Sequence, residues 1–219
     1  KNLPDNTKTL DVWLEAYTTG TLSTSQQQSI DNLLSYMSSR GVGPDWYDFM
    51  YSPSKTWDMY QRLLIPFYWR GEIVGFTGRV FEESQAVKYY TDVWPGYVFN
   101  MDVQDWTRKF VIVTEGPFDA IAVSGVSILG SEINDTQREL IDALGRQVIV
   151  VPDRDAPGEK LINQAQEFGW SVAFPEWDKT VGDVADAVLK YGRLFTIQSI
   201  LKTTESSKLK IDLKRKMYG

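Results

Sequence analysis

The chain contains neither cysteine nor histidine among its 219 residues. Disulfides are therefore impossible, and so is a zinc site built from Cys and His ligands. Catalysis by a Ser–His or Cys–His pair is excluded by the same count. Any acid–base or metal chemistry must use Asp, Glu, Lys, Arg or Tyr side chains. No run of eighteen apolar residues occurs either, so the sequence predicts no membrane span and no membrane partner.

Charge is unevenly distributed along the chain. The net charge is −6, which argues against a general nucleic-acid-binding surface. Residues 202–219 carry +4, and the preceding 201 residues carry −10. An acidic body can still bind phosphates where its carboxylates hold cations.

The composition is that of a folded protein, with 42% hydrophobic and 13% aromatic residues. Residues 1–22 are polar, contain no signal-peptide core, and are expected to form a linker. Apolar residues at i, i+3, i+4 and i+7 then predict an amphipathic helix over residues 25–39, with Ser23 as its N-cap. Two apolar segments, residues 63–69 and 72–81, predict a β-hairpin.

From Phe110 onward, short apolar strands alternate with helical patterns. The four predicted strands are F-V-I-V-T-E-G, V-S-I-L-G, Q-V-I-V-V-P-D and S-V-A-F-P-E-W. This alternation indicates a parallel α/β sheet covered on both faces. We therefore predict an α/β domain at residues 110–192, preceded by a smaller mixed α+β subdomain at residues 23–109. This subdomain is expected to be basic and to face DNA and nucleotides. A helical basic tail is predicted over residues 193–219, where Leu209, Leu213 and Met217 are spaced by four.

Acidic residues stand at the ends of the predicted strands. Glu115 ends the first strand, and Asp119 follows four residues later in the next helix. Asp153 and Asp155 end the third strand, and ligands of an open parallel sheet bind beyond the carboxyl ends of its strands. If the first and third strands are neighbours, Glu115, Asp153 and Asp155 converge. Three carboxylates in one crevice repel one another and need a cation, and Mg²⁺ prefers such oxygen ligands.

The same acids also have an ordinary structural explanation. An Asp at a strand end is commonly a turn residue or a helix N-cap. The segment D-R-D-A-P-G alone therefore leaves both a turn and a metal site open, and so does E-G-P-F-D alone. Their occurrence together, at the ends of two strands of one α/β unit, favours the metal site.

These segments resemble the TOPRIM domain, the metal-binding unit that bacterial-type primases share with topoisomerases of types IA and II and with some nucleases. E-G-P-F-D-A resembles the strand–Glu-Gly–helix motif of that family, with Glu115 and Gly116. D-R-D-A-P-G resembles its Asp-x-Asp motif followed by a glycine, here Gly158. The resemblance implies a Rossmann-like parallel sheet in which Glu115, Asp153 and Asp155 bind Mg²⁺ or Mn²⁺.

The stretch that precedes residue 110 distinguishes among TOPRIM proteins. R-L-L-I-P-F-Y-W-R-G-E-I-V-G-F-T-G-R, residues 62–79, is similar to the primase stretch I-P, a variable turn, and G-x-I-x-G-F-x-G-R. V-K-Y-Y, residues 87–90, resembles the K-Y motif of primases. The chain thus resembles a DnaG-like DNA primase over roughly residues 25–200. It is most similar to the small primases of T-even-like bacteriophages.

The resemblance implies roles for further residues. Asp183 would add to the metal site, and Asp119 would support it or simply cap or pair with a neighbour. The residues implied to face template or nucleotide phosphates are Arg79, Lys88, Tyr89, Arg154 and Lys179. A local ion pair for Arg154 and an edge-strand position for Arg79 are the ordinary alternatives.

One segment departs from the family pattern. Primases carry K-D-x-N-D/E after the fourth strand, whereas this chain has K-T-V-G-D, with Thr180 in place of the first acid. This replacement puts a second metal ion in doubt. Asp178 would substitute for the missing acid only if the loop shifts.

The sequence therefore predicts the catalytic core of a DNA primase, which joins ribonucleotides on a DNA template with Mg²⁺ or Mn²⁺. Expected partners are single-stranded DNA, ribonucleoside triphosphates and a replicative helicase. Zinc is not expected in this cysteine-free chain, and the family's zinc module is expected N-terminal to it in a longer protein. The expected location is the cytoplasm, that of the bacterial host if a phage encodes the chain.

Two alternative functions stay open at this point. The chain could be another TOPRIM enzyme, such as a nuclease or a topoisomerase fragment, which shares the acids but needs other partners. It could also be a non-catalytic module that binds DNA or a helicase and retains only a reduced metal site. Thr180 is the residue that favours this last alternative.

Overall fold

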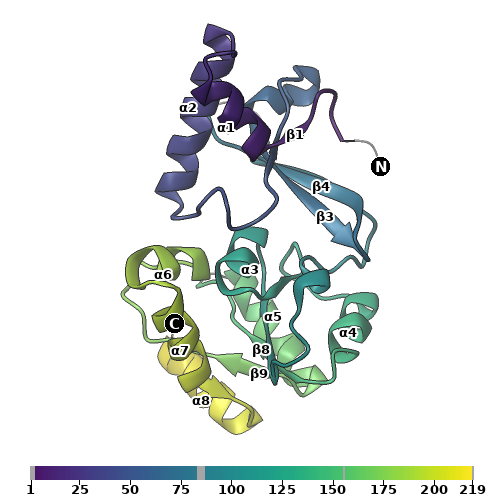
Figure 1. Ribbon diagram of the computed structural model, residues 1–219. Helices are drawn as coiled ribbons and strands as arrows, with labels where there is room; N and C mark the ends of the chain where they lie inside the picture. The colour runs from purple at the N-terminus through teal and green to yellow at the C-terminus, as the bar shows by residue number, and fades with distance from the viewer. Residues whose placement is uncertain (1–2, 83–86, 155, 219) are drawn as a thin grey trace. The chain divides into compact units, whose positions relative to one another are not determined.

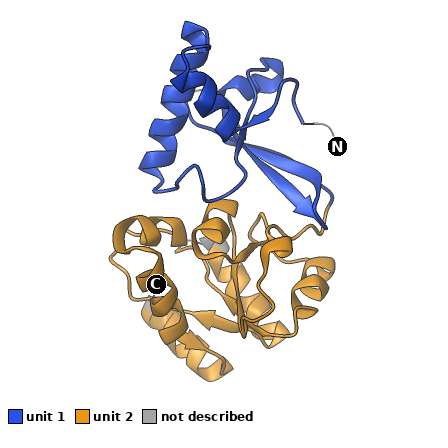
Figure 2. Ribbon diagram, in the orientation of Figure 1, with its two compact units in different colours: residues 1–94 blue, residues 95–219 orange. Residues whose placement is uncertain are grey.

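The structure is a computed structural model that describes residues 3–82, 87–154 and 156–218 (Figure 1). The chain divides into two compact units, residues 1–94 and residues 95–219 (Figure 2). Each unit contains one five-stranded sheet, so the predicted mixed α/β fold class is confirmed. Among the described helices, none has both the length and the apolar character needed to cross a membrane.

The first unit is built on an antiparallel sheet with the strand order β1-β2-β3-β4-β5. Its strands are β1 (Lys8–Thr9), β2 (Met50–Tyr51), β3 (Arg62–Trp69), β4 (Glu72–Val80) and β5 (Tyr89–Asp92). Its helices are α1 (Leu10–Thr18), α2 (Thr24–Ser39) and the short 3-10 helix η1 (Thr56–Gln61). The first six residues of β3 are buried, which makes the β3–β4 hairpin the centre of this unit.

The helix and the hairpin predicted for this unit are confirmed. Arg70 and Gly71 form the hairpin turn, with φ angles of 53° and 80°. Helix α2 begins after Ser23, whose side chain accepts a hydrogen bond from the N–H of Gln26. The Gln26 side chain in turn accepts one from the Ser23 N–H. This reciprocal capping box satisfies two backbone donors that the helix itself leaves unpaired.

The expectation of a linker at residues 1–22 is wrong, because β1 and α1 lie there. Leu10 and Trp13 are buried on one face of α1. The indole Nε1 of Trp13 donates to the carbonyl of Tyr51 at 2.9 Å, and the N–H of Leu10 donates to that of Phe49 at 2.9 Å. Two buried apolar side chains thus anchor α1, whereas its other apolar residues, Val12, Leu14 and Ala16, are exposed or half-buried.

The second unit is built on a mainly parallel sheet with the strand order β10-β9-β8-β6-β7. The first four strands of this unit, β6 to β9, are parallel, and β10 pairs antiparallel with β9. The strands are β6 (Phe110–Thr114), β7 (Val126–Ser127), β8 (Gln147–Val150), β9 (Ser171–Ala173) and β10 (Thr204–Glu205). The helices are η2 (Met101–Val103), α3 (Pro117–Val123), α4 (Asp135–Asp142), α5 (Ala156–Phe168), α6 (Val184–Tyr191), α7 (Arg193–Lys202) and α8 (Lys208–Tyr218).

The predicted alternation of apolar strands with helices is confirmed in this unit. Strands β6 and β8 are direct neighbours, with Val113 opposite Val150. The strands are almost entirely buried, as expected for a parallel sheet covered by helices. Helix α4 begins after Asn134, which forms a capping box with Gln137. The first and third predicted strands therefore end side by side, and the acids that follow them start from adjacent positions.

Residues 95–109 belong to the second unit, although they were predicted to end the α+β subdomain of residues 23–109. Phe99 is fully buried and forms an isolated antiparallel bridge with Ser127. Val98, beside it, belongs to the hydrophobic core around β6 and β8. This segment is irregular and shows no periodic pattern. The domain boundary was therefore predicted at residue 110, where the first regular strand of the unit, β6, begins.

The C-terminal residues also belong to the second unit. The predicted helical tail is two helices, α7 and α8, separated by β10, which extends the sheet beside β9. In α8 the buried residue is Ile211, whereas Leu209, Leu213 and Met217 are exposed. The spacing of apolar residues therefore indicated a helix correctly but did not indicate which of its faces is buried.

Candidate active site

Glu115 and Asp153 follow two adjacent parallel strands, β6 and β8. The N–H of Val151 continues the β6–β8 ladder by donating to the carbonyl of Val113 at 2.9 Å. Beyond it, the N–H of Asp153 donates to the carboxylate oxygen Oε1 of Glu115 at 3.2 Å. The parallel register thus brings these two acids together at the carboxyl edge of the sheet, where open α/β sheets bind their ligands.

Buried hydroxyl groups fix the backbone on either side of the Glu115 side chain. Ser127 Oγ donates to the carbonyl of Glu115 at 2.7 Å, and Thr114 Oγ1 donates to the carbonyl of Gly116 at 3.1 Å. Both hydroxyl-bearing residues are almost completely buried. The sequence did not indicate their role, because a single hydroxyl within an apolar strand has no periodic pattern of its own.

Asp119 connects the segment after β6 to helix α6. It lies in α3 and is 6% exposed. Its Oδ1 accepts a hydrogen bond from the N–H of Ala185, in the first turn of α6, at 2.8 Å. A carboxylate at this position satisfies a backbone donor and interacts favourably with the helix dipole. Gly116 leaves room for the side chain, since a Cβ there would lie 2.9 Å from Asp119 Oδ2.

Gly158 lies against the backbone of Asp153. A Cβ on Gly158 would lie 2.1 Å from the Asp153 carbonyl oxygen, which is far inside van der Waals contact. Only glycine therefore lets the first turn of α5 approach the peptide group that follows β8. This close approach is the physical reason for the glycine in D-R-D-A-P-G.

Two further metal ligands were predicted, Asp155 and Asp183. Asp155 lies outside the described residues. Asp183 is the N-cap of α6, where its Oδ1 accepts from the N–H of Asp186 at 2.7 Å. Across residues 3–82, 87–154 and 156–218, no three acids lie close enough together to hold a metal ion. Glu115 and Asp153 still fit Mg²⁺, which proteins often hold through one or two carboxylates, with waters and substrate phosphates completing the shell.

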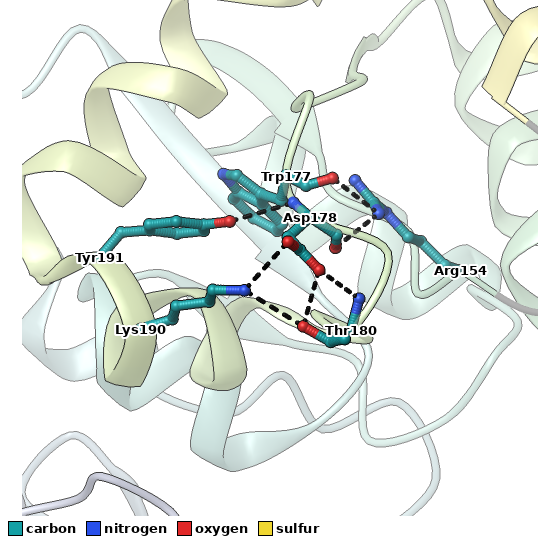
Figure 3. A network of polar contacts seen from close by, with 6 residues as sticks. All are labelled: Arg154, Trp177, Asp178, Thr180, Lys190 and Tyr191. Atoms are coloured by element: carbon teal, nitrogen blue, oxygen red, sulfur yellow. Dashed lines mark hydrogen bonds and ion pairs between the residues drawn. The ribbon is translucent and has the colours of Figure 1, made fainter.

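A polar network orders the loop after β9, which contains Thr180 (Figure 3). Asp178 Oδ1 accepts from both the N–H and the hydroxyl of Thr180, at 2.9 and 2.8 Å. Asp178 Oδ2 lies 3.3 Å from Nζ of Lys190. The hydrogen bonds from Thr180, followed by the Lys190 ammonium, lower the pKa of Asp178 from 3.8 to about 2. The Asp178 carboxylate therefore closes the turn at Thr180. In this arrangement of the loop it serves its own turn and does not replace the acid that Thr180 displaces.

Arg154 reaches the same loop from the turn after β8. Its Nη1 donates to the carbonyls of Trp177 and Asp178, each at 3.2 Å (Figure 3). Its Nη2 donates to the carbonyl of Pro175 at 2.8 Å. Lys179, on the loop itself, is exposed. Phosphate contacts of Arg154 and Lys179 remain predictions, whereas the structure shows Arg154 joining two strand-end segments.

In the first unit, Arg79 lies among the other residues predicted to face nucleic acid. Its Nε donates to the hydroxyl of Tyr36 at 2.9 Å, and its Nη1 donates to the carbonyl of Lys88 at 3.4 Å. The guanidinium lies 5.5 Å from the centre of the Tyr36 ring and 5.0 Å from that of Tyr89, within the range of cation–π attraction. Lys88 and Tyr89 are exposed. The structure thus brings the three predicted residues together and adds Tyr36.

This surface differs from the sequence prediction in two respects. The role of Tyr36 was not predicted, because its contact joins residues 43 positions apart. The region was also expected to be basic, but residues 23–109 contain eight Lys and Arg against ten Asp and Glu. That expectation is wrong, because the segment carries more acidic than basic residues.

Comparison of the sequence with protein-family models and with curated proteins finds no match. The fold is similar to the RNA polymerase domain of Mycobacterium tuberculosis primase DnaG, with 17% identity and a TM-score of 0.68 over 90% of this chain and 84% of that chain. It is also similar to the zinc-binding and RNA polymerase domains of the Aquifex aeolicus primase, with 21% identity and a TM-score of 0.65 over 77% and 55%. A DnaG primase catalytic domain bound to single-stranded DNA matches with 20% identity and a TM-score of 0.54 over 65% and 53%.

These similarities establish the fold of the chain, which is that of a DnaG-type primase catalytic core. The chain spans about half the length of the Aquifex aeolicus protein and of the DNA-bound domain. The activity, the substrates and the partners of this chain are therefore proposals.

Proposed function

We propose that this chain is the catalytic part of a DNA primase, which synthesises short RNA primers on a single-stranded DNA template. The main support is the pairing of Glu115 with Asp153 beyond two adjacent parallel strands. That pairing occurs in a fold shared with primase catalytic cores. Acids gathered at this edge of the sheet need a cation before they can act on anionic phosphates.

In this proposal, Glu115 and Asp153 hold Mg²⁺ or Mn²⁺. Asp155, outside the described residues, stays a predicted third ligand, and Asp183 stays a predicted fourth whose carboxylate already caps α6. When bound, such an ion stabilises the charge that develops on the phosphate oxygens, so the absence of histidine is no obstacle.

The surrounding residues hold the two acids in a fixed arrangement. Ser127 fixes the backbone at Glu115, Gly158 lets α5 approach Asp153, and Asp119 ties the segment after β6 to α6. Groups that are already in place require no reorganisation when the reaction begins, which is a large part of electrostatic catalysis. The role of these residues is therefore to orient the acids.

Arg79, Lys88 and Tyr89 are proposed to bind the template or the incoming nucleotide. The Arg79 guanidinium is held between two tyrosine rings and retains N–H groups that can face phosphate. The Tyr89 ring is 38% exposed and offers a surface on which a base can stack. Because the chain carries a net charge of −6, binding should depend on these local contacts and weaken steeply with salt.

The proposal includes partners that differ in their support. A similar primase domain has been solved with single-stranded DNA bound, which supports single-stranded DNA as the template of this chain. Ribonucleoside triphosphates as substrates, a replicative helicase as partner and a separate zinc module rest on the motif resemblance alone. The closer likeness to the small primases of T-even-like phages rests on the order of the motifs.

A template assay tests the proposed function. The chain is incubated with single-stranded DNA, labelled ribonucleotides and Mn²⁺, and the products are separated by size. We expect short RNA that requires the template and disappears in Asp153→Asn but not in Lys160→Met, which removes an exposed cation of α5. Nicking or relaxation of DNA without ribonucleotides would instead indicate another TOPRIM enzyme. DNA binding that survives loss of both acids, with no RNA made, would indicate a non-catalytic module.

A further inference from the structure

Arg154 joins the turn after β8 to the loop after β9. Its guanidinium donates to the carbonyls of Trp177 and Asp178, each at 3.2 Å (Figure 3). It also donates to the carbonyl of Pro175 at 2.8 Å. Its own backbone N–H donates to the carbonyl of Gly182 at 3.4 Å. A single residue therefore contacts both the beginning and the end of that loop.

These acceptors are neutral carbonyl groups. They therefore require a side chain with several correctly placed N–H donors more than they require a positive charge. Pro175 and Trp177 are buried, and buried backbone carbonyls are normally paired within the protein. Arginine presents five N–H donors in a planar fork, which lets one side chain bridge several carbonyls at once. A lysine at position 154 would place a single ammonium group there and would not span all three.

The loop that Arg154 contacts is itself held in place by other side chains. Asp178 closes a turn with Thr180, and Lys190 contacts both residues. Trp177 Nε1 donates to Oγ of Ser199, in α7, at 2.8 Å. The loop is therefore a fixed element to which the turn after β8 can be attached.

The loop leads into α6, and α6 leads back to the two acids. Ala185, in the first turn of α6, donates its N–H to Asp119, which lies four residues after Glu115. The N–H of Asp153 donates to Glu115. Arg154 closes this ring of contacts, which joins the segments that follow β6, β8 and β9.

We infer that Arg154 is a positioning residue, which holds Asp153 beside Glu115 by attaching the turn after β8 to the loop after β9. The inference rests on the proposed function, because it concerns the same pair of acids. It gives Arg154 a role different from the phosphate contact that the sequence implied.

Three variants of the full chain test the inference. Arg154→Met removes the guanidinium donors, and Arg154→Lys keeps the charge without the planar fork. Lys160→Met is the matched control, since it removes an exposed cation of α5 whose Nζ contacts Glu132 at 2.7 Å. Two quantities are measured in each: the Mn²⁺ affinity, by calorimetric titration, and the amide hydrogen exchange of residues 180–182.

We expect Arg154→Met to weaken Mn²⁺ binding by about tenfold or more, which is the usual effect of removing a group that orients a metal ligand. We also expect faster exchange at residues 180–182, because their loop loses its attachment to the turn after β8. Arg154→Lys should lie between Arg154→Met and the unsubstituted chain in both quantities. Lys160→Met should match the unsubstituted chain.

The outcomes separate this inference from the proposed function. If Arg154→Met matches Lys160→Met in Mn²⁺ affinity or in exchange, the inference is wrong, whether or not the chain makes RNA. If both effects appear but the unsubstituted chain makes no RNA on a template, the proposed function is wrong and the positioning role stands. A chain that binds no Mn²⁺ overturns both.

The inference can still be tested if one of the variants does not fold. Should Arg154→Met fail to fold, Arg154→Lys provides the same two measurements with smaller expected changes. An Arg154→Lys chain that equals the unsubstituted chain in both quantities would then contradict the inference.

Discussion

Acidic side chains stand beyond strand ends at two places in the second unit, and their partners differ. After β9, Asp178 is hydrogen-bonded by Thr180 and paired with the ammonium of Lys190, and its pKa falls to about 2. After β6, the carboxylate of Glu115 accepts from the backbone N–H of Asp153. The contacts with Thr180 and Lys190 assign Asp178 to the architecture of its loop. Glu115 and Asp153 are the acids proposed to hold a divalent cation, because they follow two adjacent parallel strands and contact each other there.

Neutralising the strand-end acids should have the largest effect. Glu115→Gln and Asp153→Asn keep the size of the side chain but remove its charge, so we expect primer synthesis to fall by about 100-fold or more. Asp178→Asn is the matched substitution after β9. Its amide oxygen can still accept from Thr180, so the loop should stay closed and synthesis should change little. The rates are measured on a single-stranded template, with circular dichroism to verify folding. Equal losses in Asp153→Asn and Asp178→Asn would erase the distinction between the two places.

The backbone at Asp153 should be sensitive to any side chain at position 158. In Gly158→Ala the added Cβ would lie 2.1 Å from the Asp153 carbonyl oxygen, so the turn must move, at a cost of about 1–3 kcal/mol in the free energy of unfolding. Gly130→Ala is the control, because a Cβ there meets nothing within 4 Å. Urea unfolding measures both. A Gly158→Ala chain as stable as Gly130→Ala would show that the contact is relieved without strain.

In the first unit, the residue to compare with the acids is the cationic Arg79, and the expected effect of replacing it is smaller. If Arg79 contacts a phosphate, Arg79→Met should weaken binding to single-stranded DNA and reduce the slope of log affinity against log salt by about 1. Tyr36→Phe, which loses only the hydroxyl that accepts from Arg79, should have a weaker effect in the same direction. Lys55→Met, which removes an exposed cation of the same unit, is the control. The same salt slope in Arg79→Met and Lys55→Met would argue against a phosphate contact.

The smallest expected effect is on the titration of Asp178. Because its folded pKa lies below the ordinary 3.8, the stabilisation from its carboxylate is complete above that value and is lost as the pH falls through about 2. Lys190→Met removes the ammonium but leaves the hydrogen bonds from Thr180, so the pKa should rise only part of the way toward 3.8. Carboxyl chemical shifts followed by NMR measure it. An unchanged pKa would mean that the hydrogen bonds alone hold it low.

Much of the second unit could be predicted because its determinants are local. Apolar strands alternate with capped helices, and the two acidic motifs stand within a few residues of strand ends, where a parallel sheet gathers them. Once β6 and β8 are neighbours, Glu115 and Asp153 lie together without any further information. The sequence therefore predicted the contact between Glu115 and Asp153, whereas Asp155, the third acid predicted to converge there, lies outside the described residues. The structure adds how the backbone of Glu115 and Asp153 is held.

The rest could not be predicted, because it depends on polar contacts between distant residues. The bonds from Arg154 to the loop after β9 and from Arg79 to Tyr36 join residues more than twenty positions apart, and such contacts leave no periodic pattern. Helix α1 buries only Leu10 and Trp13, is only nine residues long and follows a mostly polar segment. In α8, spacing by four marks a helix whichever of its faces is buried.

Calorimetric titration of Mn²⁺ tests the central claim, that Glu115 and Asp153 form the cation site, most directly. We predict that the unsubstituted chain and Asp178→Asn bind Mn²⁺ with the same affinity. Glu115→Gln and Asp153→Asn should each bind at least about tenfold more weakly, since even residues behind a metal ligand contribute that much. Equal affinity in all four chains would contradict the claim.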